Sequence, residues 1–362
     1  MQMLSRRSSL PLLYYSYCAS SITSRVAGLS RKMSSSTTPA SGRSSSSILG
    51  KTLVSVPDAI SLHDDGGAGN VKFIDGTWWL DKSKNGREDF EKGPRISGAR
   101  YLDIDDVSTK TPDNLPHMMP PSWLQAASMD AMGVRKSDHV IVYGSHDCMF
   151  VTRAYMQMRT MGHPKELCHL MDGSLEEWID TGGPIEEAET LPSHPVVDAS
   201  SLAESAAPPT YEATDPQNVV GMDELRALID DGKTMGEDPD ALVVDARSAG
   251  RFSGEAPEPR PGLRGGHMPG ARNLPITDLL DPENKVRLKP AEDLKKILLD
   301  AGISLPLGAS SPKIVSTCGS GVTACALLAA LDVLDEDSSR VYLYDGAWVQ
   351  WGGRSDTPVV KE

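Results

Sequence analysis

The chain has 362 residues, of which 39% are hydrophobic and 24% charged, and its formal net charge is −14. This length exceeds one typical domain and predicts two, each large enough for its own core. Residues 1–57 hold seven basic side chains and no acidic one, so the remainder carries 29 basic against 50 acidic residues, a net charge of −21. A body this acidic repels nucleic acid and anionic membranes, and we expect neither as a partner.

Residues 1–57 have the profile of an organelle transit peptide, because they are rich in Arg and Ser, free of acidic residues and apolar at Leu10–Tyr15. The alternative, a disordered basic tail, is disfavoured by the complete absence of acidic residues. The spaced arginines favour a mitochondrial address, in the matrix, over a plastid one. A form that starts at Met33 would lack most of this leader and would stay in the cytoplasm.

After the leader, short β-branched and apolar runs alternate with longer helical stretches. The expected strands are Val71–Ile74, Val140–Tyr143 and Leu167–Met171 in the first half, and Leu242–Val244, Lys313–Thr317 and Val341–Tyr344 in the second. These runs are continuously apolar rather than alternating, which is typical of parallel strands covered on both faces. With helices such as Met222–Asp231 and Ala291–Asp300 between them, we expect an α/β fold of two domains, each a parallel sheet flanked by helices.

The two halves repeat each other. Blocks recur in the same order with a shift of 172 or 173 residues: Ser97–Arg100 with Pro269–Arg272, Val140–Ser145 with Lys313–Cys318, Met171–Gly173 with Tyr344–Gly346, and Trp178 with Trp351. A period this long excludes a solenoid and indicates a duplicated domain. Residues 186–217 are rich in Pro, Ala, Glu and Ser and read as a linker. We therefore expect a leader at 1–57, a first domain at 58–185 and a second at 218–360.

Cys318 follows the strand expected at Lys313–Thr317 and precedes an apolar helical run that starts at Thr323. The loop between them lies at the carboxyl end of a parallel strand, where α/β proteins bind ligands. Gly319 and Gly321 allow successive backbone N–H groups to point inward, which together with the positive end of the helix stabilises a thiolate. We also expect Thr323 to cap the helix. The pattern predicts a reactive cysteine rather than a small buried hydrophobe.

The other cysteines indicate neither a disulfide framework nor a zinc site. The five cysteines of the chain are odd in number and lack CxxC spacing. Cys325 lies among apolar residues of the expected helix, and we expect it, Cys148 and Cys168 to be buried thiols. No apolar run approaches the ~18–20 residues needed to cross a bilayer, so we expect a soluble protein.

The loop Cys318-Gly-Ser-Gly-Val-Thr323 resembles the active loop of the tandem-domain rhodanese superfamily, in particular of its 3-mercaptopyruvate sulfurtransferases. Further motifs occur in the order found in that family: Asp245-Ala-Arg247, Gly250-Arg251-Phe252, Glu258-Pro-Arg260, Gly266-His-Met-Pro-Gly-Ala271 and Asp345-Gly-Ala-Trp348. The resemblance covers about Val54 to Val360 and implies two rhodanese domains of which only the second is catalytic. Ser145 stands where the duplication places Cys318, which agrees with a non-catalytic first domain.

The resemblance implies transfer of sulfur from 3-mercaptopyruvate to a thiol acceptor such as thioredoxin, or to cyanide, with release of pyruvate. It implies neither a metal nor an organic cofactor. The residues that match the family's site are Cys318 as nucleophile, Gly319, Gly321, Val322 and Thr323 as the cradle of the persulfide, Arg251 and Arg260 as substrate-binding groups, and Ser320, Asp105 and His117 as the proton-handling set. Arg247, Arg264 and His267 are expected to be structural.

Three other functions are weighed against this one. Thiosulfate sulfurtransferases of the family carry Arg-Lys after the cysteine, whereas Gly319 and Ser320 are neutral, so we favour mercaptopyruvate and keep thiosulfate:cyanide transfer as the alternative. The related phosphatases need an arginine where this chain has Ala324. A non-enzymatic sulfur-carrier or redox-sensing module would keep the cysteine but would not need the arginine pair.

Overall fold

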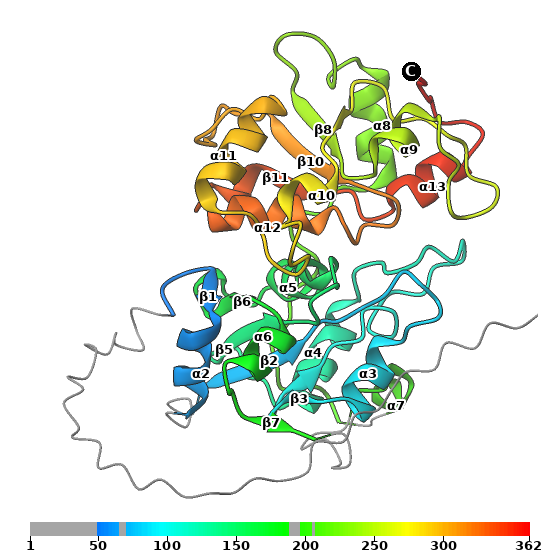
Figure 1. Ribbon diagram of the computed structural model, residues 1–362. Helices are drawn as coiled ribbons and strands as arrows, with labels where there is room; N and C mark the ends of the chain where they lie inside the picture. Colours follow the sequence, from blue (N-terminus) through cyan, green and yellow to red (C-terminus); the bar gives the residue numbers. More distant parts are fainter. Residues whose placement is uncertain (1–48, 65–69, 188–195, 205–206) are drawn as a thin grey trace, which may run out of the picture. The chain divides into compact units, whose positions relative to one another are not determined.

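The computed structural model describes residues 49–64, 70–187, 196–204 and 207–362. The leader expected at 1–57 lies mostly outside these residues. The described chain forms two parallel sheets, one from each half of the duplication, and a short two-stranded sheet (Figure 1). No helix within the described ranges has the length and apolar character needed to cross a membrane.

The first sheet has the strand order β1-β6-β5-β2-β4, and every neighbouring pair is parallel. Its strands are β1 (Leu53–Ser55), β2 (Val71–Asp75), β4 (Arg100–Tyr101), β5 (His139–Tyr143) and β6 (Cys168–Asp172), while β3 (Arg95–Ile96) and β7 (Ile185–Glu186) form a separate antiparallel pair. The three strands expected in this half are present. β1 lies inside the range expected for the leader, so the fold begins before residue 58.

Helices cover both faces of the first sheet. They are α2 (Val56–Asp64), α3 (Gly86–Lys92), α4 (Ser122–Ala131), α5 (Val151–Thr160) and α6 (Leu175–Asp180), with a 3₁₀ turn, η2, at Lys165–Leu167. α2, α3 and α6 bury one face, whereas α4 and α5 bury the other. The stretch expected as a linker contains a short helix, α7 (Ala199–Ala203), which begins where Asp198 accepts a hydrogen bond from Ser200 N.

The second sheet has the order β11-β10-β8-β9 and is also parallel. Its strands are β8 (Ala241–Asp245), β9 (Arg272–Asn273), β10 (Lys313–Thr317) and β11 (Val341–Leu343). Its helices are α8 (Met222–Asp230), α9 (Ala249–Ser253), α10 (Ile276–Leu279), α11 (Ala291–Asp300), α12 (Cys325–Val333) and α13 (Ala347–Gly353), with a 3₁₀ turn, η3, at Ser338–Arg340. The expected fold class, two α/β domains with parallel sheets flanked by helices, is confirmed.

The start of α12 differs from the expectation. The helix begins at Cys325, and the expectation that Thr323 caps it is wrong, because the N-cap is Ala324 and no side chain accepts a hydrogen bond there. The first N–H groups are satisfied in a tight turn instead: Cys325 N donates to Val322 O and Ala326 N to Thr323 O, both at 3.2 Å.

One apolar cluster joins the two sheets. α5 of the first half packs against α12 of the second. Both helices belong to a single buried cluster that reaches Ile74 and Val142 on the first sheet and Val244 and Ile314 on the second. α12 is buried along almost its whole length, as expected of a helix that is apolar on every face. The α5–α12 contact therefore links the halves at the helix that follows Cys318.

Candidate active site

Cys318 follows β10 directly and is 2% exposed. Its loop, residues 318–324, is called the cysteine loop here, and two of its carbonyls are bound by α13: Cys318 O accepts from Trp348 N at 2.9 Å and Gly319 O from Val349 N at 3.0 Å. The backbone N–H groups of residues 319–324, in contrast, donate to no acceptor among the described residues. Free N–H groups between a parallel strand and a helix form an anion-binding nest. The expected cradle is thus available to negative charge on sulfur.

The side chain of Arg251 lies against the cysteine loop. Its Nη2 is 2.5 Å from Glu258 Oε2, and a methyl group on Gly319 would lie 2.9 Å from the same nitrogen. Gly319 therefore gives the guanidinium room to approach. The buried Glu258 also binds Arg247 at 2.8 Å, and Arg247 in turn pairs with Asp245 at 2.6 Å. Arg247 is thus held on both sides, in agreement with the structural role expected for it.

Arg260 is the cation of this cluster that forms no direct ion pair with a described carboxylate. Among the described residues it has no hydrogen-bond or ion-pair partner. Burial lowers the pKa of Arg260, and the neighbouring charge of Arg251 lowers it further. Cys318, Glu258 and Asp105 act in the opposite direction. Arg247 and Arg251 are paired with Asp245 and Glu258, whereas Arg260 forms no ion pair with any residue that the structure describes. A guanidinium beside the cysteine that no internal ion pair occupies suits a substrate carboxylate.

The first half contributes a carboxylate–imidazole pair. His117 Nδ1 lies 2.6 Å from Asp105 Oδ1, although the angle departs from that of an ideal hydrogen bond. Trp78 Nε1 donates to Asp105 Oδ2 at 2.8 Å. Partial burial would raise the pKa of Asp105, but the contacts with His117 and Trp78 lower it to about 2. His117 Nε2 is buried and has no hydrogen-bond partner in the described part of the chain. An imidazole with one nitrogen on a carboxylate and the other free is arranged as a general base.

A buried arginine that no sequence motif marks connects this pair with the cysteine loop. Arg153, on α5, donates from Nη1 to Asp345 Oδ1 at 2.7 Å and to Gly321 O at 3.2 Å, and from Nη2 to His117 O. Asp345 Oδ2 also accepts from Met119 N at 2.5 Å. One ion pair therefore touches both the cysteine loop and the segment that carries the imidazole.

Ser320 lies in the cysteine loop but is not joined to His117. Its side chain is largely buried and its hydroxyl forms no hydrogen bond with any residue that the structure describes. The structure thus brings together Cys318, the arginine pair and the cradle, and it brings Asp105 to His117. It leaves the link from Ser320 to the imidazole open.

The corresponding loop of the first half has the N–H groups of its first two residues occupied. Ser145 N donates to Thr77 Oγ1 at 3.1 Å, and His146 N donates to Glu176 Oε2 at 2.8 Å. A carboxylate of the protein itself thus lies on this loop, and the nucleophile is absent. Both features favour the expectation that the first half is not catalytic.

The remaining described cysteines are buried and free. Burial raises the pKa of Cys148 and that of Cys325 to about 12, and it raises the pKa of Cys168 as well. These thiols are therefore protonated at neutral pH and are poor nucleophiles. Within the described ranges, no three His, Cys, Asp or Glu side chains cluster as metal ligands would.

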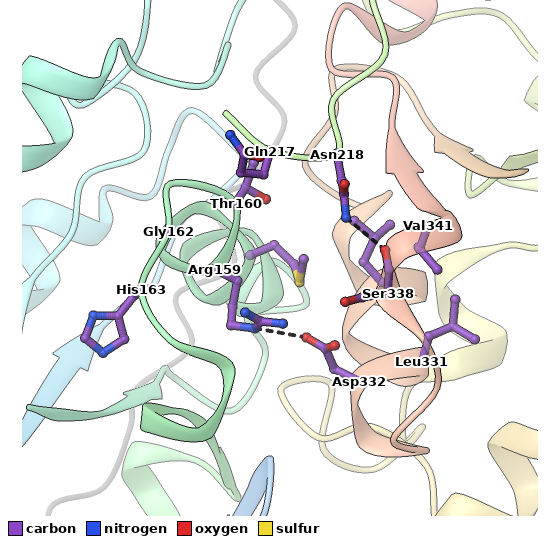
Figure 2. A pocket seen from close by; sticks show the side chains of 12 residues that line it. Arg159, Thr160, Gly162, His163, Gln217, Asn218, Leu331, Asp332, Ser338 and Val341 are labelled. Carbon is purple, nitrogen blue, oxygen red and sulfur yellow. Dashed lines mark hydrogen bonds and ion pairs between the residues drawn. The ribbon is translucent and has the colours of Figure 1, made fainter. Parts of the chain in front are cut away.

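A cavity of about 320 Å³ lies elsewhere, beside the C-terminal parts of α5 and α12 (Figure 2). Met156 and Arg159 of α5 and Leu328, Leu331 and Asp332 of α12 line it, and Arg159 Nε is 3.3 Å from Asp332 Oδ2. None of the expected site residues lines this cavity. We therefore do not assign the reaction to it.

Comparison with known proteins agrees with the geometry. The family model of the rhodanese-like domain matches residues 60–181 and 222–354. The chain is 32% identical to thiosulfate/3-mercaptopyruvate sulfurtransferase 1, mitochondrial, of Arabidopsis thaliana, over 80% of this chain and 74% of that protein. It is 36% identical to the 3-mercaptopyruvate sulfurtransferase of Escherichia coli K12, over 77% of this chain and 87% of that protein.

Solved structures agree as well. The crystal structure of the Saccharomyces cerevisiae Tum1 protein superposes with a TM-score of 0.68 at 28% identity, covering 86% of this chain and 98% of that one. The structure of SseA from Escherichia coli, described as a 3-mercaptopyruvate sulfotransferase with the rhodanese fold, superposes with a TM-score of 0.62 at 29% identity, covering 82% and 99%. The chain belongs to the rhodanese family and, within it, to the sulfurtransferases.

Proposed function

We propose that this protein transfers the sulfur of 3-mercaptopyruvate through a persulfide on Cys318. The observation that carries the proposal is the combination of free N–H groups in the cysteine loop with the guanidinium of Arg260, which no ion pair of the described chain occupies, beside it. The N–H groups suit a persulfide anion, and the guanidinium suits the substrate carboxylate. The name of the Escherichia coli relative, which gives the same donor, supports this choice.

In the donor step the substrate carboxylate binds Arg260 and Arg251. The Cys318 thiolate attacks the substrate sulfur, so an S–S bond forms while the bond from sulfur to C3 breaks. The electron pair of the broken bond leaves with pyruvate as its enolate. The outer sulfur stays on Cys318 as a persulfide anion, which the N–H groups of the cysteine loop stabilise.

His117 moves the proton of this step. The thiol proton of the substrate passes to His117 Nε2, with Ser320 as the relay between them, and returns to C3 of the enolate, so the step neither consumes nor releases a proton. Asp105 is ionised at neutral pH because its pKa is about 2. Its carboxylate holds Nδ1 and stabilises the imidazolium that forms in between.

Thiosulfate is the second candidate donor, because the Arabidopsis relative is named for both donors. The neutral Gly319 and Ser320 favour mercaptopyruvate, since they place no cation next to Cys318 for the second negative charge of thiosulfate. Steady-state kcat/KM for both donors on one preparation decides between them, and a higher value for thiosulfate would reverse the assignment.

The acceptor in the second half-reaction is proposed to be a thiol, such as that of thioredoxin, or cyanide. Attack of the acceptor on the outer sulfur returns Cys318 to its thiolate. Following persulfide loss from the isolated intermediate after addition of each acceptor tests this assignment, and an intermediate stable to both would refute it.

We place the protein in the mitochondrial matrix. We also propose two domains at 58–185 and 218–360, the first of them extended at its start by β1 and the first residues of α2. The acid-free, arginine-rich residues 1–57 support the location. The Arabidopsis relative is named as mitochondrial, and a similar yeast structure, at 26% identity, is described as a mitochondrial complex I sulfur transferase subunit; both support the same location. A fluorescent protein fused after residue 57 should reach the matrix. Accumulation in the cytoplasm or a plastid would overturn the proposal.

Replacing the nucleophile tests the proposed function itself. We expect Cys318→Ser to release no pyruvate from 3-mercaptopyruvate, because an alcohol at this position cannot hold a persulfide. Cys168→Ser is the matched control, since that thiol is buried in β6, where its charged neighbours are Arg159 and Asp332, and it should leave pyruvate release within about twofold. Turnover by Cys318→Ser would contradict the mechanism.

A further inference from the structure

Two arginines of α5 form ion pairs across the contact between the halves. Arg153 pairs with Asp345 at 2.7 Å, and Arg159 pairs with Asp332 at 3.3 Å, the pair drawn with a dashed line in Figure 2. Both aspartates are nearly inaccessible to solvent. Burying an ion pair brings little net stability, because both charges lose their hydration. A fully buried pair therefore calls for a role beyond holding the halves together.

The partners of Arg153 supply such a role. Its guanidinium donates to Gly321 O in the cysteine loop, to His117 O and to Asp345, which in turn accepts from Met119 N. The fit is tight at the loop: Gly321 has φ +79°, and a methyl group there would lie 2.6 Å from Asp345 Oδ1. The ion pair thus fixes the cysteine loop and the backbone around His117 against one another.

His117 needs this support because of its backbone. Its φ is +60°, in the left-handed region, which costs a non-glycine residue free energy and persists only where the surroundings enforce it. The bond from Arg153 to the His117 carbonyl and the bond from Met119 N to Asp345 hold the chain at the strained position and two residues after it. In this conformation the imidazole reaches Asp105 at 2.6 Å and leaves Nε2 free.

We propose that Arg153 is a positioning residue for sulfur transfer: together with Asp345 it holds the imidazole of His117 in register with the cysteine loop. The inference rests on the proposed function, because it assumes that His117 moves the substrate proton. Without the guanidinium, His117 relaxes from its left-handed conformation and its ring leaves the productive position. Arg251 and Arg260 stay where they are, so substrate binding persists while the chemical step slows.

Arg159 provides the matched control. It lies on the same helix, pairs with a buried aspartate of the second half in the same way, and touches neither the cysteine loop nor the His117 segment. In each Arg→Met variant the aspartate keeps another partner, Met119 N for Asp345 and Tyr155 Oη for Asp332. Asp332 also keeps Lys165 at 3.8 Å, so Arg159→Met removes the milder structural contact. Only Arg153→Met removes the positioning contact, and the split between kcat and KM together with the state of the His117 ring distinguishes its loss from a general structural effect.

The experiment measures pyruvate release from 3-mercaptopyruvate by the full chain as wild type, Arg153→Met, Arg153→Lys and Arg159→Met. We expect Arg153→Met to lower kcat by about 10²-fold with KM within about twofold, because misplacing a catalytic group slows the chemical step. Arg153→Lys should recover part of the loss, since an ammonium pairs with Asp345 but does not span all three acceptors. Arg159→Met should keep kcat within about twofold. Equal losses in the two Arg→Met variants, or a change in KM alone for Arg153→Met, would overturn the proposal.

A spectroscopic measurement separates this inference from the proposed function. NMR signals of the His117 ring, assigned with His117→Gln, should shift in Arg153→Met and stay in place in Arg159→Met. Unchanged signals in both variants would overturn the positioning role, and this conclusion holds even if the wild type is inactive on mercaptopyruvate. A wild type without pyruvate release contradicts the proposed function instead. If Arg153→Met does not fold, Arg153→Lys and Asp345→Asn take its place, and a kcat equal to that of the wild type in both would refute the inference.

Discussion

Replacing Arg260 by methionine isolates substrate binding from stability. Arg260 has no internal partner among the described residues, so its removal leaves no carboxylate unpaired, and methionine keeps the apolar part of the side chain. Arg251 differs, because it is bound to Glu258, whose side chain is 1% exposed. Arg251→Met therefore leaves a buried carboxylate with one partner fewer and lowers stability as well as binding.

The size of the effect follows from the contact that is lost. A hydrogen bond to a charged group contributes about 1.5–3 kcal/mol, which corresponds to a factor of about 10 to 150. We expect Arg260→Met to lower kcat/KM for 3-mercaptopyruvate by this factor, chiefly through KM, because the carboxylate is bound equally in the ground state and the transition state.

The assay combines steady-state pyruvate release with thermal unfolding. Arg260→Met should keep the wild-type Tm within about 2 °C, whereas Arg251→Met should lower it by more. A kcat/KM for Arg260→Met within twofold of the wild type would refute the assignment of Arg260 to the substrate. A Tm as low as that of Arg251→Met would refute the conclusion that Arg260 has no structural role.

Two further predictions concern Asp105 and Gly319. The pKa of Asp105 is about 2 against an ordinary 3.8, so its ionised contacts stabilise the fold fully above about pH 4 and lose this contribution as the pH falls towards 2. Because the side chain is 49% exposed, we expect Asp105→Asn to lower the free energy of unfolding by about 1 kcal/mol rather than by the full linkage value. Urea unfolding should give the same difference between wild type and variant at pH 7 and at pH 5, and a difference that is smaller at pH 5 would contradict this pH dependence. Gly319→Ala places a methyl group 2.9 Å from Arg251 Nη2 and should raise KM several-fold by displacing that guanidinium. The cost in Tm should be small, since the methyl group meets the end of a flexible side chain. An unchanged KM would refute the close approach of Arg251.

The sequence predicts the sheets well because the signal for a buried parallel strand is local. The runs at Lys313–Thr317 and Ala291–Asp300 form a strand and a helix with the expected ends. β1 escapes such reasoning, because a strand of three residues owes its existence to pairing with β6. The start of α12 is misjudged for a related reason: apolar character marks which residues are buried, whereas the first turn depends on backbone bonds around Val322 and Thr323.

Within the site too, the sequence reveals the local features and misses the contacts between distant residues. Cys318 and its glycines are visible because strand, loop and helix follow one another in the chain. Arg153 is not visible, because its partner Asp345 is 192 residues away and Gly321 is 168 residues away. The left-handed backbone of His117 and the bond from Trp78 to Asp105 also arise only in the folded chain. What sequence reasoning misses are the contacts that bring the two halves of the site together.

In the proposed reaction Cys318 carries the transferred sulfur. Mass spectrometry of the protein after incubation with 3-mercaptopyruvate in the absence of an acceptor tests it most directly. We expect one added sulfur, about 32 Da, on the peptide that contains Cys318, and its loss when a thiol acceptor is added. Added mass on a peptide with another cysteine, or no added mass while pyruvate is released, would contradict the account.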